Sequence, residues 1–190
     1  MKRLTFLFAA AGVVALGLAS SWAFTRVFRA DSPQLSPVAP HAVWVFKTDD
    51  LGAMARYADA VIVATLQARY SGRTAYSSNG EVALDFEIND FVVAEPPIKS
   101  DAYVGGAATV ERLKGRSFDG GDFEIGERYL LFLKKQPDTN IYVVVNDEGR
   151  FFVGSRSRLY SAASGQVAAT LRGRSLDDAR SLIRASLERQ

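Results

Sequence analysis

The most regular alternation of apolar and polar residues lies between positions 81 and 89. A repeat of two places one set of side chains on each face of a β-strand, so this segment predicts a strand that packs one face on a core. We expect the polar set to face solvent. The apolar set is Val82, Leu84, Phe86 and Ile88, and the polar set is Glu81, Asp85, Glu87 and Asn89. The phase changes after Asn89-Asp90, which predicts a bulge or sharp bend of the kind that small barrels need.

Other apolar runs bounded by turn residues predict further short strands. These lie at residues 60–69, 107–113, 129–133, 141–145 and 151–153. A last hairpin is predicted from Leu159 and Tyr160 with residues 167–171. The segment 129–133 is aromatic or aliphatic at every position. It is therefore expected to be the central strand, buried on both faces.

Two segments have the spacing of an amphipathic helix. The apolar positions are Leu51, Met54, Ala55 and Ala58 in residues 50–58, and Leu176, Ala179, Leu182, Ile183 and Leu187 in residues 176–188. Ser175 and Asp178 are typical of a helix start. The predicted fold class is mainly β, a small antiparallel barrel with a short N-terminal helix and a C-terminal helix at 175–189.

A different pattern occupies residues 1–24, where Lys2 and Arg3 precede an uncharged apolar run. This segment is expected to direct export, as a signal peptide or as a membrane anchor. A helix of about 20 apolar residues can span a bilayer. Ser21-Trp22-Ala23 fits a signal-peptidase site, whereas Trp22 and the arginines that follow fit an interfacial flank. We expect an extracytoplasmic protein, either secreted or membrane-anchored by residues 4–24.

Residues 25–43 are predicted to be a proline-rich linker. A segment of this composition buries too little apolar surface to fold, and its prolines favour an extended chain. The prolines are Pro33, Pro37 and Pro40. Residues 44–190 are long enough for one domain with its own core, and we expect this domain to hold the barrel and the C-terminal helix.

The composition excludes several kinds of chemistry. The chain has no cysteine, so disulfides, thiol catalysis and cysteine-bound metals are ruled out. Nucleophilic hydrolysis needs a hydroxyl paired with a base, and the chain has neither a nucleophile elbow nor a Ser-x-x-Lys motif. We expect no enzymatic activity and no cofactor. Without Lys2 and Arg3, the 23 basic residues fall to 21, equal to the 21 acidic residues, so net charge implies no strong electrostatic partner.

Charge is unevenly distributed along the chain. Acidic residues predominate between positions 81 and 127, whereas every charged residue between 149 and 175 is an arginine. These candidate binding residues are Arg150, Arg156, Arg158, Arg172 and Arg174. Two interpretations remain open. The acidic and basic sets form solvated faces that attract each other, or the arginines form a contact surface for an anionic envelope polymer or for lipid headgroups.

A short acidic loop is a candidate metal site. Asp119, Asp122 and Glu124 surround Gly120-Gly121, and carboxylate oxygens are the ligands that calcium prefers. The spacing differs from that of the twelve-residue calcium loop. A turn with solvated acids is the alternative interpretation.

Two segments carry a resemblance to a known fold. The chain resembles a loose group of uncharacterised bacterial exported proteins in two segments, which are separated by a long bent strand. These segments are Ala58-Asp59-Ala60-Val61-Ile62-Val63 and Gly126-Glu127-Arg128-Tyr129-Leu130-Leu131-Phe132-Leu133. Their barrels are similar to the OB-type barrels of tissue inhibitors of metalloproteinases and netrin modules. The resemblance covers residues 59–153 and implies an OB-like barrel. The cysteines of those inhibitors are absent here, so their inhibitory mechanism does not carry over.

Together these patterns predict a non-catalytic exported binding or interaction module of the cell envelope. One alternative is an OB-fold binder of anionic polymers that uses the five arginines. Another is a metal-assisted hydrolase that uses Asp119, Asp122 and Glu124. The expected partner is an unknown envelope protein or polymer, or the membrane itself through an uncleaved N-terminal segment. Export and the near-zero net charge disfavour nucleic acid.

Overall fold

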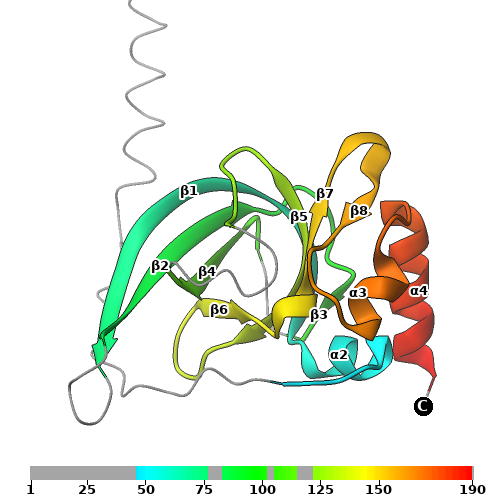
Figure 1. The fold of residues 1–190 in the computed structure, drawn as a ribbon, viewed down its shortest axis with the longest axis horizontal. Helices are drawn as coiled ribbons and strands as arrows, with labels where there is room; N and C mark the ends of the chain where they lie inside the picture. The colour runs from blue at the N-terminus through cyan, green and yellow to red at the C-terminus, as the bar shows by residue number, and fades with distance from the viewer. Residues whose placement is uncertain (1–45, 77–82, 102–104, 115–121, 190) are drawn as a thin grey trace, which may run out of the picture. The chain divides into compact units, whose positions relative to one another are not determined.

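The computed structural model describes residues 46–76, 83–101, 105–114 and 122–189 (Figure 1). The predicted export segment and linker lie outside these residues. The strands are β1 (Ala60–Tyr76), β2 (Ala83–Val92), β3 (Lys99–Ser100), β4 (Ala107–Leu113), β5 (Arg128–Lys135), β6 (Ile141–Val144), β7 (Arg150–Val153) and β8 (Leu159–Tyr160). The α-helices are α2 (Leu51–Tyr57), α3 (Gln166–Leu171) and α4 (Leu176–Glu188), and short 3-10 turns lie at Asp147–Gly149 and Ser155–Ser157.

The strands form one eight-stranded mixed sheet in the order β3-β1-β2-β4-β6-β5-β7-β8. An additional pairing of β1 with β5 closes part of this sheet into a ring. The mainly β fold is thus confirmed, with helices towards both ends of the described chain. The prediction of a wholly antiparallel sheet is wrong in one pair, because β4 and β6 run parallel. The ring β1-β2-β4-β6-β5 contains five strands. Strand directions cannot alternate all the way round a ring with an odd number of strands, so one neighbouring pair has to be parallel.

The long strand β1 carries the irregularity that the sequence predicted beside Asn89-Asp90. Leu66 is opposite Phe91 whereas Ala68 is opposite Asp90, so Gln67 is an extra residue in β1. The bulge therefore lies in the partner strand, while β2 itself runs without interruption. A second register shift lies between Ser71 and Thr74. Such shifts bend a strand and increase its twist, and Figure 1 shows β1 curving over its whole length.

The predicted orientation of β2 is wrong for Glu87 and Asn89, which are buried at 6% and 0% exposure. Both side chains share the face of Phe91, because residues two apart in a strand point the same way. Arg112 of β4 is directly opposite Glu87, and Arg69 of β1 is directly opposite Asn89. These arginines compensate the buried carboxylate, which the alternation within β2 alone does not reveal.

Two hydrophobic clusters fill the two sides of the sheet. The inner core contains Ala60, Ile62, Ala64, Leu66, Phe91, Val93, Ala108, Val110, Phe123, Tyr129, Leu131, Leu133 and Tyr142. The outer core joins the opposite face of the sheet to the helices, which Figure 1 shows gathered on one side. Strand β5 contributes Leu131 to the inner core and Leu130 and Phe132 to the outer core. The prediction that this segment is buried on both faces is confirmed.

Both predicted helices form at the expected places in the chain, each with a capping residue at its start. Asp50 caps α2, and its carboxylate accepts hydrogen bonds from the backbone N–H groups of Ala53 and Gly52. These two bonds lower the pKa of Asp50 below its ordinary value. Ser175 caps α4 and accepts from the Asp178 N–H at 3.1 Å. None of the helices in the described part of the chain is long and apolar enough to span a bilayer.

The second half of the predicted last hairpin is wrong, because residues 166–171 form α3. Val167, Ala168 and Leu171 are buried on one side of this helix. Ala168 and Leu171 follow Val167 by one and by four residues, and side chains at these positions share a face of a helix but not of a strand. The Glu148 carboxylate accepts a hydrogen bond from the Ala168 N–H at 2.9 Å. A carboxylate at the N-terminal end of a helix accepts from a backbone N–H group that has no partner within the helix.

Candidate basic binding site

Four of the five arginines singled out from the sequence lie on two adjacent segments of the surface. Arg156 and Arg158 belong to the turn that joins β7 to β8, and Arg172 and Arg174 belong to the link between α3 and α4. All four side chains are exposed. We call this surface, made of Arg156, Arg158, Arg172 and Arg174, the basic corner.

Backbone hydrogen bonds hold the two segments of the basic corner side by side. The Leu159 N–H donates to the Arg174 carbonyl at 3.0 Å, and the Gly173 N–H donates to the Leu159 carbonyl at 2.8 Å. Arg158 also forms an antiparallel bridge with Ser175. The arginines therefore meet because the fold brings β8 against the α3–α4 link.

Three of the guanidiniums are fixed by bonds to backbone carbonyls. Arg158 donates to the Gly173 carbonyl at 2.6 Å, Arg174 donates to the Thr170 carbonyl at 2.7 Å, and Arg172 donates to the Ala163 carbonyl. A guanidinium has five N–H donors, so one such bond orients the group and leaves donors for an anion. Side chains that are already ordered lose less conformational entropy when they bind.

The turn that carries Arg156 has an unusual backbone. The φ angles of Arg156 and Ser157 are 56° and 54°, a left-handed conformation that residues other than glycine adopt infrequently. Such a conformation costs about 1 kcal/mol or more per residue. The bond from the Gly154 N–H to the Arg158 carbonyl, 2.9 Å long, closes this turn. The strained turn therefore carries the first arginine of the basic corner.

No carboxylate within the described ranges forms an ion pair with any arginine of the basic corner. Other arginines in the described ranges do form ion pairs, among them Arg73 with Glu111 and Arg180 with Glu95. Several described acidic residues between positions 81 and 127 form ion pairs in other parts of the fold, namely Glu87, Glu95, Asp101, Glu111 and Asp122. The basic corner thus carries four positive groups that form no ion pair with a described carboxylate.

Arg150 does not join the basic corner. It lies in β7 opposite Leu131 of β5, on the inner face of the sheet. Its guanidinium carbon is 4.9 Å from the centroid of the Phe123 ring. Burial lowers the pKa of Arg150 from its ordinary value, and the positive charge of Arg112 lowers this pKa further.

Tyr160 adds an exposed aromatic ring beside the basic corner, and sequence reasoning missed it as a binding residue. Its exposed fraction is 46%, and it follows Arg158 by two positions, which places the two side chains on the same side of an extended segment. Its ring packs on Phe152 with centroids 6.2 Å apart. No pattern in the sequence marks Tyr160 as a binding residue, because its exposure follows from the burial of Leu159, which only the structure shows.

Gly154 allows this aromatic pair to form. A Cβ atom at position 154 would lie 2.7 Å from Cε2 of Tyr160 and 3.0 Å from Cε1 of Phe152. Both distances are shorter than van der Waals contact between carbon atoms. Any larger residue would displace one of the two rings.

The predicted metal loop is only partly described, because Asp119 lies outside the described residues. Asp122 forms an ion pair with Arg112, and Glu124 is exposed. Between them, Phe123 is fully buried in the inner core. The described residues contain no group of three or more histidine, aspartate or glutamate side chains placed to hold a metal ion.

A polar cluster occupies one end of the inner face. The Glu87 carboxylate lies 3.9 Å from Nε of Arg69 and 3.8 Å from Nε of Arg112. Asn89 donates to the same carboxylate at 3.4 Å. Within the described residues, Nε of Arg69 and Oδ1 of Asn89 have no hydrogen-bond partner.

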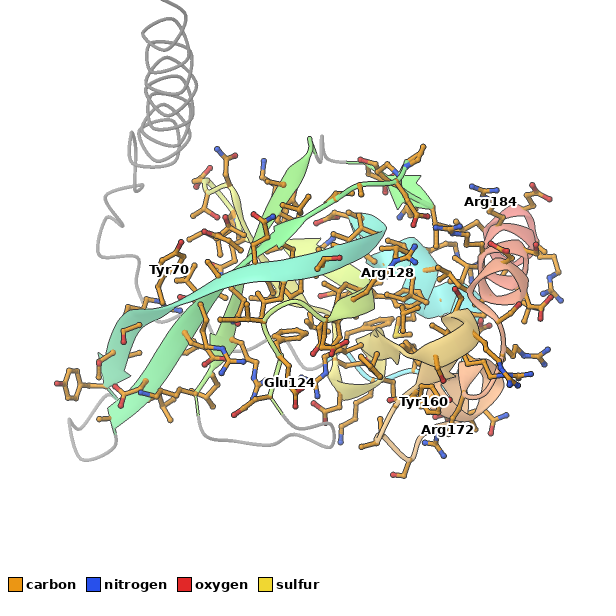
Figure 2. All side chains as sticks on the ribbon, turned by 90° about the horizontal axis from the view of Figure 1, so that it is seen from above. Tyr70, Glu124, Arg128, Tyr160, Arg172 and Arg184 are labelled. Carbon is orange, nitrogen blue, oxygen red and sulfur yellow. The ribbon has the colours of Figure 1, made fainter. Side chains whose placement is uncertain are left out.

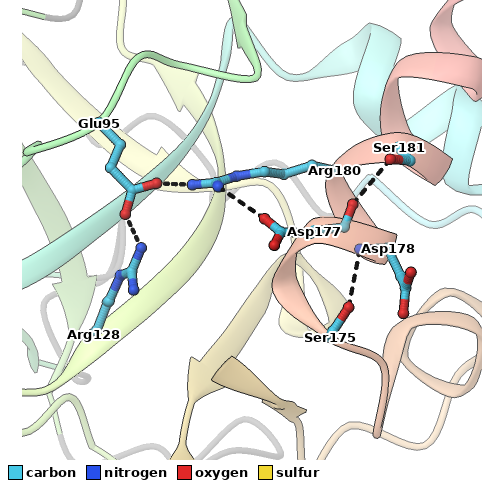
Figure 3. A network of polar contacts seen from close by, with 7 residues as sticks. All are labelled: Glu95, Arg128, Ser175, Asp177, Asp178, Arg180 and Ser181. Atoms are coloured by element: carbon cyan, nitrogen blue, oxygen red, sulfur yellow. Dashed lines mark hydrogen bonds and ion pairs between the residues drawn. The ribbon is translucent and has the colours of Figure 1, made fainter. Parts of the chain in front are cut away.

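Figure 3 shows how a single carboxylate connects the sheet to the C-terminal helix that supports the basic corner. Glu95 accepts from Arg128 of β5 and from Arg180 of α4. Arg180 also reaches Asp177 at 3.3 Å, one turn earlier in the helix. This network fixes the first half of α4, and with it the start of the helix at Ser175.

Replacing Glu95 by glutamine should lower the free energy of unfolding by about 1 kcal/mol, because two guanidiniums then lose their shared carboxylate. The loss should be larger at low salt, where repulsion between Arg128 and Arg180 is screened less. Urea unfolding at low and high salt measures both effects. Asp177→Asn is the control, since that side chain is 90% exposed and its loss should change stability little. If both substitutions lower the free energy of unfolding equally, Glu95 does not have the proposed role between Arg128 and Arg180.

The two segments that resemble OB-type barrels pair with each other in the structure. Ala60 of β1 is opposite Leu133 of β5, and the Asp59 carboxylate accepts bonds from Nζ of Lys134 at 2.6 Å and from the Lys135 N–H at 2.8 Å. Comparison of the chain with protein-family models, curated proteins and solved structures finds no match. The resemblance stays a prediction, and the functional conclusion rests on the geometry of the basic corner.

Proposed function

We propose that this protein is a non-catalytic, exported binding module of the cell envelope that holds an anionic polymer at the basic corner. The observation that carries this proposal is the gathering of Arg156, Arg158, Arg172 and Arg174 from two segments, without a carboxylate partner in the described residues. Guanidinium groups recognise carboxylate and phosphate oxygens through several N–H donors at once.

The proposal includes an OB-like barrel as the scaffold. It is supported by the β1–β5 pairing, which joins the sheet into a partial ring, and by the bulged and curved β1. OB folds bind oligonucleotides and oligosaccharides, but fold alone does not define a ligand. The export segment predicted at residues 4–24 supports the extracytoplasmic location.

The test is binding of the full chain, in mild detergent, to poly-L-glutamate at several salt concentrations. We expect affinity to fall steeply with salt, because binding releases condensed counterions. The double substitution Arg156→Gln with Arg174→Gln should weaken binding about thirtyfold, at about 1 kcal/mol for each arginine near an anionic surface. Lysine at both positions should restore part of the affinity because it keeps the charge.

The matched control is Arg184→Gln with Arg189→Gln. Both arginines are exposed on or next to α4, and their removal changes the net charge equally. Arg184 lies about 13 Å along the helix axis from Ser175, and Figure 2 shows it apart from Arg172. If the two double variants weaken binding equally, only net charge acts and the basic corner is not the site. Binding to vesicles of anionic lipid, without binding to polymer, would replace the polymer by a membrane surface.

A further inference from the structure

The described residues include few exposed large hydrophobic side chains, and one of them lies beside the basic corner. Tyr70, Tyr76 and Ile125 belong to other parts of the fold, whereas Tyr160 directly follows Leu159, whose backbone bonds to Arg174 and Gly173. In the view of Figure 2, Tyr160 and Arg172 lie towards the same side of the molecule and Tyr70 lies towards the other side. An exposed aromatic ring thus lies two positions after Arg158, in the strand whose backbone is bonded to the α3–α4 link.

The Tyr160 ring is held in place from behind. Phe152 packs against it, and the contacts continue inwards from Phe152 to Tyr129 with centroids 6.0 Å apart and from Tyr129 to Phe123 at 5.0 Å. Tyr129 and Phe123 belong to the inner core. The outermost ring of this series is therefore backed by rigid packing, and only its outer part is left for a ligand.

Because of this arrangement, we propose that the ligand of the basic corner is an acidic polysaccharide whose sugar rings pack on Tyr160. This inference rests on the proposed function and specifies the chemistry of its ligand. The C–H face of a sugar ring is apolar and buries area against a flat aromatic ring. The acidic groups of neighbouring sugar units bind Arg158 and the arginines of the α3–α4 link.

The spacing of the site suits a polymer of rings. Arg158 and Tyr160 are about 6.5 Å apart along an extended segment, so a ring on Tyr160 and a carboxylate on Arg158 belong to the same or adjacent units. A polymer without rings uses only the arginines. A nucleic acid offers bases for stacking and phosphates for the arginines, but the predicted export segment and the balanced charge of the domain favour the sugar polymer.

The experiment compares two carboxylate polymers of equal charge, polygalacturonate with rings and poly-L-glutamate without rings, using the full chain. We expect Tyr160→Ala to weaken polygalacturonate binding about five- to tenfold and to leave poly-L-glutamate binding unchanged. Tyr160→Phe keeps the ring and should retain affinity. Tyr70→Ala, which removes a tyrosine of 54% exposure away from the basic corner, should affect neither polymer.

The outcomes separate this inference from the proposed function. If neither polymer binds, the proposed function fails. If both bind equally and Tyr160→Ala changes neither affinity, the basic corner binds anions but the polysaccharide assignment is overturned. Tighter binding of single-stranded DNA than of polygalacturonate, again dependent on Tyr160, would overturn the assignment in favour of nucleic acid.

Discussion

Phe123→Ala should lower the free energy of unfolding by about 3–5 kcal/mol, the cost of removing a large aromatic side chain from a packed core. The ring is fully buried, although it lies in a short acidic sequence. It makes edge contacts with Phe91 and Tyr129, each with centroids 5.0 Å apart. The guanidinium carbon of Arg150 lies 4.9 Å from its centroid. Its removal leaves a cavity in the inner core.

The electrostatic consequence should add to the loss of packing. Arg112 lies on the same ring, with its guanidinium carbon 5.6 Å from the centroid, so Phe123 contacts two positive groups. The negative face of an aromatic ring attracts a cation by about 0.5–2 kcal/mol. Phe123→Leu restores most of the volume but not this attraction, and it should therefore recover only part of the stability.

Urea unfolding of the full chain measures these differences. Ile125→Ala is the control, because Ile125 is 63% exposed and its loss should change stability by about 0.5 kcal/mol or less. A cost below about 1 kcal/mol for Phe123→Ala, where large core truncations cost several, would show that the ring does not fill the inner core. Binding at the basic corner should survive in any variant that remains folded.

Local patterns predicted the elements whose formation depends on local interactions. The helices α2 and α4 follow from their apolar spacing, and the start of α4 follows also from its capping residue Ser175. Helix α3 was missed because Val167, Ala169 and Leu171 also read as a strand alternation. Its start is stabilised by Glu148, a residue distant in sequence, and no local pattern contains that contact.

The two faces of the sheet were harder to predict than the strands themselves. The period of two in β2 is real, but polarity assigned Glu87 and Asn89 to the solvent side although both are buried. The compensating charges come from Arg69 and Arg112, in the two neighbouring strands. Knowing which face is buried therefore required the strand order, which periodicity does not provide.

For the candidate site, too, local sequence patterns predicted only part of the arrangement. The absence of acidic residues between positions 149 and 175 was sufficient to single out the arginines of the basic corner. It was not sufficient to separate Arg150, whose pairing opposite Leu131 turns it towards the inner core. Tyr160 became visible as a binding residue only when its packing on Phe152 and its exposure were known.

Arg73→Met should lower the free energy of unfolding by about 3 kcal/mol, because breaking a buried ion pair leaves a carboxylate without compensation. Arg73 donates two bonds to Glu111, at 2.8 and 3.0 Å, and Glu111 is only 4% exposed. The pair connects β1 to β4 across β2, and the guanidinium lies over the Phe86 ring at 4.3 Å. Gln136 also donates to Glu111, at 2.8 Å, but an amide carries no charge.

Replacing both partners by apolar residues should cost much less than the sum of the single changes. Glu111→Leu combined with Arg73→Met removes the buried charge together with its partner, and such replacements of buried pairs are often close to neutral. The double-mutant cycle, measured by urea unfolding, should therefore show a coupling energy of about 2 kcal/mol or more. The control is the pair of Lys99 with Asp101, which is 2.7 Å long but has Asp101 61% exposed. Exposed pairs contribute about 1 kcal/mol or less, so equal coupling in the two cycles would mean that burial does not set the strength of the Arg73–Glu111 pair.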